Sequence, residues 1–133
     1  MKIGLIDVDG HNFPNLALMK LSAWQKGERH HVEWCDGLSH YDVVFMSKVF
    51  DFSPDWTQCL DADIVIRGGT GYGLENDHPL PYHIEHCYPD YSLYGITDTA
   101  YGLLTRGCSR PCPFCIVRDK EGTKSLQVPD PAV

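Results

Sequence analysis

The sequence predicts an α/β fold, with a small parallel sheet in the first half of the chain and a shorter region around a cysteine-rich loop. Apolar, β-branched runs at residues 2–8, 31–35, 42–46 and 63–67 are typical of buried strands. A helical pattern separates the first two runs. Parallel strands need such a crossover between them, so this order favours parallel pairing.

Residues 15–26 predict the first helix. Its apolar residues recur at helical spacing and share one face, namely Ala17, Leu18, Leu21 and Trp24. Asn12 or Asn15 is suited to cap the amino end, and Gly27 stands where helices commonly end. The stretch between the third and fourth strands is short and contains SPDW, which disfavours a full helix there.

We expect three regions along the chain. Residues 1–73 form the α/β domain. Residues 74–100 are rich in proline and poor in periodicity, which predicts a connecting segment with at most a short helix around His83–His86. Residues 101–133 begin with a strand at 101–105, YGLLT, which leads directly into the cysteine loop.

Composition narrows the classes of function. The chain has 133 residues and a formal net charge of −7, which disfavours nucleic-acid and anionic membrane partners because both usually need a basic face. No apolar run approaches the length of a membrane span. The amino-terminal apolar stretch stops at Asp7, too soon for a signal peptide. We therefore expect a cytoplasmic protein with reduced thiols.

The stretch TRGCSRPCPFC places Cys108, Cys112 and Cys115 in one loop with the spacing C-x3-C-x2-C. Thiolates are the ligands that iron–sulfur clusters and structural zinc prefer. In a reducing compartment, clustered cysteines indicate metal binding or redox chemistry rather than disulfides. No cysteine or histidine follows Cys115, so a fourth protein ligand would have to lie upstream.

Two alternatives for this loop stay open at the level of residues. The first is a zinc site, in which Cys112 and Cys115 form a C-x2-C pair and a second pair comes from His83, His86 or Cys87. The second is incidental clustering in a proline-rich loop. Neither accounts for a third cysteine in the same short loop without a fourth.

The C-x3-C-x2-C spacing resembles the hallmark of the radical S-adenosylmethionine (SAM) superfamily. In that family three cysteines hold three irons of a [4Fe–4S] cluster, and the fourth iron stays open for the amino and carboxylate groups of SAM. The resemblance implies that Cys108, Cys112 and Cys115 are the cluster ligands. It also implies that Phe114, the aromatic residue before the last cysteine, lies by the adenine.

The resemblance implies an enzyme, or the amino-terminal part of one, that cleaves SAM reductively to methionine and a 5′-deoxyadenosyl radical. An electron donor such as flavodoxin or ferredoxin would reduce the cluster. The substrate is not indicated. The competing hypothesis is a non-catalytic zinc- or iron–sulfur-binding module.

The family's loop follows the first strand of a partial (β/α) barrel, and YGLLT occupies that place here. Such a barrel needs on the order of 200 residues. Residues 101–133 supply only the first strand and the cluster loop. We therefore expect a truncated radical SAM barrel, or one half of a split enzyme whose barrel comes from a second chain.

The first domain is similar to the flavodoxin-like, B12-binding-like domains that precede some radical SAM barrels. In DGHNFP, Asp9 and His11 match the cobalamin motif D-x-H-x-x-G, while Pro14 replaces its glycine. Residues 47–49 and the glycine pair 68–69 are comparable to the family's S-x-L and GG motifs. The resemblance thus implies Asp9 and His11 as cobalamin candidates. The alternative is a polar turn between strand and helix.

Overall fold

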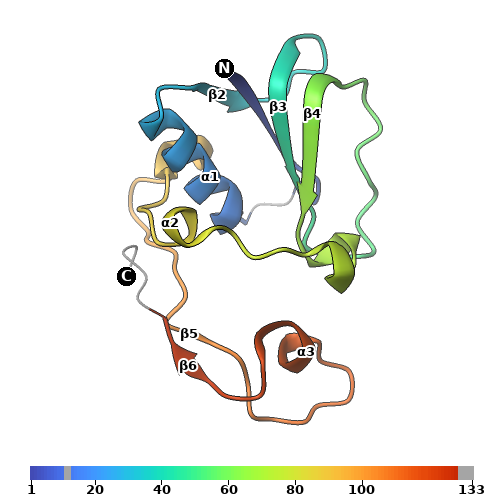
Figure 1. The fold of residues 1–133 in the computed structure, drawn as a ribbon, viewed down its shortest axis with the longest axis vertical. Coiled ribbons are helices and arrows are strands. Elements are labelled where there is room, and N and C mark those ends of the chain that lie inside the picture. Colours follow the sequence, from blue (N-terminus) through green and yellow to red (C-terminus); the bar gives the residue numbers. More distant parts are fainter. Residues whose placement is uncertain (11–12, 129–133) are drawn as a thin grey trace. The chain divides into compact units, whose positions relative to one another are not determined.

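A computed structural model describes residues 1–10 and 13–128 of the chain (Figure 1). The chain divides into two compact units, Met1–Thr97 and Asp98–Val133. The first unit contains a four-stranded parallel sheet, and the second contains a two-stranded antiparallel pair. The predicted α/β class is therefore confirmed for the first unit.

The sheet is built from β1 (Lys2–Asp7), β2 (His31–Trp34), β3 (His40–Ser47) and β4 (Asp61–Gly68). The strands lie in the order β2-β1-β3-β4, and every neighbouring pair is parallel. Ile3 of β1 pairs with Val32 on one side and Val43 on the other. All four predicted strands are confirmed. Placing β1 and β3 in the centre buries the most apolar runs of the sequence.

Helix α1 (Leu16–Gly27) follows β1, as predicted. The side chain of Asn15 caps it by accepting a hydrogen bond of 3.2 Å from the backbone N–H of Leu18. Leu18 and Leu21 are buried against Ile3 of β1, and each such side chain stabilises the fold by about 1.5–3 kcal/mol. Among the described residues, no helix is long and apolar enough to cross a membrane.

Helix α2 (Tyr82–Glu85) lies beside α1 (Figure 1). Its Ile84 is buried in the same core as Leu18, and Leu80 and Leu93 pack against that core. The predicted connecting segment, residues 74–100, therefore divides differently in the structure, because up to Thr97 it belongs to the sheet unit. The widely spaced apolar residues that anchor this segment have no regular period. Short 3₁₀ turns also lie in this unit at Thr70–Tyr72, Leu74–Asn76 and Tyr91–Tyr94.

The second apolar cluster of the sheet is covered without a helix. Its buried residues include Ile6, Val44 and Met46. Trp56 and Leu60, from the connection between β3 and β4, pack against them. This connection holds no helix, as its length and its SPDW sequence predict. The irregular connection between β3 and β4 thus covers the face of the sheet that a second layer of helices covers in a larger α/β fold.

The second unit contains β5 (Thr105–Arg106), α3 (Val117–Glu121) and β6 (Leu126–Gln127). The predicted strand at 101–105 is therefore shorter and starts later than expected. Its partner is β6, and the pairing is antiparallel. A further backbone hydrogen bond of 2.9 Å, from Val128 to the carbonyl of Leu104, extends this pairing. The strand that precedes the cysteine loop is thus held by the strand that follows it.

Candidate functional site

The three cysteines of the motif lie in one loop whose base is closed by Glu121 of α3. Arg106 donates from Nη1 to Oε1 of Glu121 over 2.9 Å. The backbone N–H of Gly107 donates to Oε2 of the same carboxylate over 3.1 Å. The Glu121 side chain therefore holds in place the two residues that precede Cys108. Glu121 was not among the predicted site residues, because no local sequence pattern marks a carboxylate that acts across a loop.

Gly107 makes the close approach at this base possible. Its φ is +85°, a conformation that residues with a side chain rarely adopt. A Cβ at this position would lie 2.1 Å from the carbonyl oxygen of Lys124. Because that oxygen belongs to the backbone, no side-chain rotation relieves the clash. Glycine is therefore required where the chain enters the loop.

The cysteines themselves are half-buried free thiols. The backbone N–H of Cys108 donates to the carbonyl of Gly122 over 3.3 Å, and that of Cys115 donates to the carbonyl of Cys112 over 3.2 Å. The second bond closes a turn between the last two cysteines. The three sulfur atoms do not gather within 4.8 Å of one another, as the ligands of a single ion would. In a four-iron cluster each thiolate binds a different iron, so the three sulfur atoms do not have to meet at a single metal ion.

Two other side chains of this unit, one exposed and one buried, have polar or aromatic groups without an assigned role. Phe114, next to Cys115, is 89% exposed. Arg118 of α3 has a buried Nε that finds no hydrogen-bond partner among the described residues. An unpaired buried donor costs about 1–3 kcal/mol, and an acceptor could reach this atom only if the side chain moved, because the atom is closed to solvent.

The upstream ligands of the zinc alternative all have contacts within the first unit. The ring of His83 packs on Trp24 with 4.4 Å between centroids. Nδ1 of His86 lies 2.9 Å from the carbonyl oxygen of Tyr82. The thiol of Cys87 donates to the carbonyl of Lys20 over 3.4 Å. Burial raises the pKa of Cys87, which favours the thiol over the thiolate that zinc needs. Zinc binding through Cys87 would replace its hydrogen bond to Lys20, whereas the contact at Nδ1 of His86 leaves Nε2 for a metal.

A cavity of about 490 Å³ lies where β1 and β3 end, at the carboxyl edge of the parallel sheet. Its walls are mostly apolar, and they are formed by Asp7, Phe13, Pro14, Asn15, Leu16, Val49 and Phe50. The two polar side chains are already bonded: Asp7 accepts from the hydroxyl of Tyr94 over 2.6 Å, and Asn15 donates to Ser47 over 2.8 Å. No lysine or arginine is among these residues, so the described part of the lining offers no such countercharge to a phosphate.

The cobalamin candidates lie next to this cavity in the sequence. Asp9 accepts hydrogen bonds from the backbone N–H groups of Val49 (2.7 Å) and Phe50 (3.2 Å) and from the hydroxyl of Ser53 (2.6 Å). Its carboxylate therefore anchors the chain that follows β3. His11 lies outside the described residues. Cobalamin binding by this pair stays a prediction.

Comparison with known proteins does not assign a function to this chain. No family model matches the chain, and neither a curated protein nor a solved structure shows significant similarity to it. The cysteine loop, its closed base and the chemistry of its donors are therefore the features that indicate a function.

Proposed function

We propose that the chain is a radical SAM enzyme, or the amino-terminal part of one, in which Cys108, Cys112 and Cys115 bind three irons of a [4Fe–4S] cluster. The observation that carries the proposal is the set of three cysteines in one loop, with no other cysteine or histidine in residues 98–133. Such a donor set leaves one iron open for SAM. When bound, the cluster and SAM supply the 5′-deoxyadenosyl radical chemistry.

The protein's own contribution is to position the thiolates. The Glu121 carboxylate and the β5–β6 pairing bring the two ends of the loop together. Gly107 allows the backbone to approach Lys124 at that point. This arrangement lowers the entropy that the loop would lose when three thiolates bind to one cluster.

The surroundings of the loop suit an anionic group. A cluster with three thiolates is anionic overall, and Arg110 lies between two of the cysteines in the sequence. Arg118, on the helix that follows the loop, adds a second positive charge three residues after Cys115 in the sequence. Phe114 is exposed beside Cys115, where the proposal places the adenine of SAM. An aromatic ring in this position would stack on the base.

The first unit suits a domain in front of such an enzyme. The strand order β2-β1-β3-β4 is the one with which flavodoxin-like sheets begin. This order supports the B12-binding-like front domain of the proposal. In this proposal the rest of the barrel is supplied by further chain or by a second chain. The electron donor is a separate protein, and the substrate is not specified.

The test is anaerobic reconstitution with iron and sulfide. It compares the natural chain with Cys108→Ala and with the control Cys59→Ala, which removes an exposed thiol outside the loop. We expect about four irons per chain in a brown, oxygen-sensitive protein. Cys108→Ala should lose the cluster, and Cys59→Ala should keep it.

A second measurement separates a SAM-binding cluster from an ordinary ferredoxin-type cluster. Addition of SAM should change the electron paramagnetic resonance spectrum of the reduced cluster, because SAM coordinates the open iron. A colourless protein that holds one zinc and is indifferent to Cys108→Ala would refute the proposal. Loss of that zinc in a His83→Ala or His86→Ala variant would establish the zinc module instead.

A further inference from the structure

A second group of metal-ligand side chains lies at the amino ends of β3 and β4, the opposite edge of the sheet from the cavity. His40 and Asp42 alternate along β3, and Asp61 and Asp63 alternate along β4. The register pairs His40 directly with Asp61. One ligand atom from each of His40, Asp42 and Asp63 lies within 4.8 Å of the other two. Parallel pairing of two strand ends thus brings an imidazole and two carboxylates to one point.

The imidazole of His40 is oriented by Asp61. Nδ1 of His40 lies 2.9 Å from Oδ1 of Asp61, within hydrogen-bond distance. Nε2 faces the other way and lies 3.5 Å from Oδ1 of Asp63. When Nδ1 carries the proton that Asp61 accepts, the lone pair of the neutral ring is on Nε2. A carboxylate that holds the outer nitrogen of a ligand histidine is the usual support of a metal-bound imidazole.

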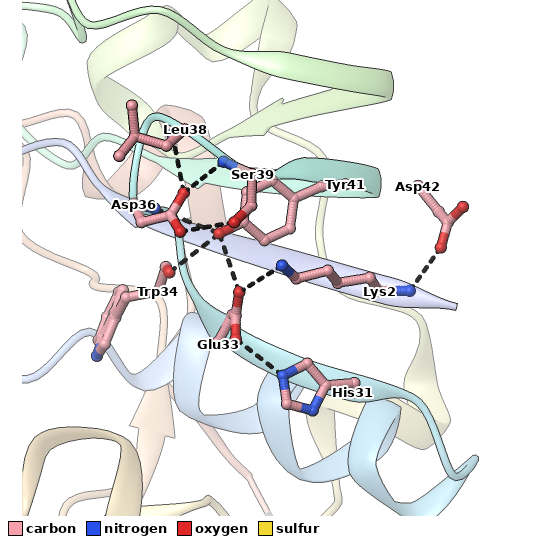
Figure 2. A network of polar contacts seen from close by, with 9 residues as sticks. All are labelled: Lys2, His31, Glu33, Trp34, Asp36, Leu38, Ser39, Tyr41 and Asp42. Carbon is pink, nitrogen blue, oxygen red and sulfur yellow. Dashed lines mark hydrogen bonds and ion pairs between the residues drawn. The ribbon is translucent and has the colours of Figure 1, made fainter.

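The carboxylates of this group have no lysine or arginine side chain to neutralise them in the described part of the chain. Asp42 accepts from the backbone N–H of Lys2 over 2.5 Å. Figure 2 shows that the ammonium group of the same lysine points instead to Glu33, at 2.9 Å. His40 is the basic side chain paired with Asp61 and Asp63. The group therefore holds three carboxylates against one imidazole, which favours a cation with more than one charge.

We propose that His40, Asp42 and Asp63 bind a divalent cation of the zinc type, with Asp61 as the residue that positions the imidazole. One nitrogen and two carboxylate oxygens form a donor set that Zn²⁺ accepts, at about 2.0–2.2 Å from each ligand atom. The side chain of His40 is 51% exposed, so water completes the coordination. This site is independent of the cysteine loop and of the function proposed for it.

Binding at this place would join two strands. β4 is an edge strand of the sheet, and within the sheet it pairs only with β3. A cation shared by the two strands adds a link between their amino ends. Because the cation binds the folded arrangement and not the separated strands, the thermal midpoint should rise with its concentration.

The test uses the full chain with the three loop cysteines changed to serine, which removes the strongest competing zinc ligands. Zn²⁺ is titrated by calorimetry, and the ring signals of His40 are followed by nuclear magnetic resonance. We expect one Zn²⁺ per chain and a shift of the His40 ring signals at saturation. His40→Ala and Asp63→Asn should abolish the binding, and Asp61→Asn should weaken it by about tenfold or more.

His31 provides the matched control. Its Nε2 lies 2.8 Å from Oε2 of Glu33, and its side chain is 67% exposed, so it forms a comparable surface pair on the same sheet. His31→Ala should leave zinc binding unchanged. Absence of saturable binding at millimolar Zn²⁺, or binding that survives His40→Ala, would overturn the proposal. The group would then be a surface ion pair of protonated His40. Circular dichroism of each variant checks that the fold is kept.

Discussion

Replacing Gly107 by alanine tests whether the closed base of the loop controls metal loading. The φ of +85° alone costs an alanine about 1–3 kcal/mol. Its Cβ would also lie 2.1 Å from the carbonyl oxygen of Lys124, and forcing apart such a contact costs about 1–3 kcal/mol more. The sum is about 2–6 kcal/mol.

That cost is as large as the stability available to this part of the protein. Residues 98–133 form a small unit, and a unit of this length typically has a free energy of unfolding of about 2–5 kcal/mol. We therefore expect Gly107→Ala to open the β5–β6 pairing and to lower the iron bound after reconstitution several-fold. The sheet unit should be unaffected.

Gly122 is the matched control for this substitution. Its φ is +99°, but nothing lies within 4 Å of a Cβ built on it. Gly122→Ala therefore carries the backbone strain without the clash. Iron content and amide hydrogen exchange of β5 and β6 should separate the two variants. Equal iron content and equal exchange in both would refute the argument that close packing against Lys124 closes the loop.

Three further predictions concern the first unit. Lys20 is 2% exposed, and its Nζ donates to the carbonyl of Glu85 and lies 3.8 Å from that residue's carboxylate. Lys20→Ala should lower the free energy of unfolding, measured in urea, by about 3–5 kcal/mol. Lys20→Met should lower it clearly less, because methionine keeps the packing of the methylene groups. Asp9→Ala removes an acceptor shared by three donors and should lower the free energy of unfolding by about 1.5–3 kcal/mol. Amide hydrogen exchange in the residues after β3 should become faster. Unchanged exchange there would contradict the anchoring role of Asp9. The hydrogen bond to Asp61 raises the pKa of His40, so a magnetic resonance titration without metal should find this pKa above the ordinary value, and Asp61→Asn should lower it. Because the folded pKa is the raised one, the stabilisation from this pair is present at low pH and is lost as pH rises through that pKa; a titration that Asp61→Asn leaves unchanged would contradict the assignment.

The sequence by itself determined the regular elements of the sheet unit. The four apolar runs became β1 to β4, and the helical pattern between the first two became α1 with Asn15 as its cap. These features follow from periodicity and capping, which depend only on residues a few positions apart. The spacing of the three loop cysteines is also local, so the sequence was sufficient to single out the candidate site.

The tertiary structure decided what depends on residues far apart in the chain. Ile84 binds residues 74–97 to the sheet unit, and Glu121 closes the cysteine loop from the next helix. Asp63 meets His40 because β3 and β4 pair in one register. Non-local contacts of this kind arise from packing and strand register, and no pattern within a single segment encodes them.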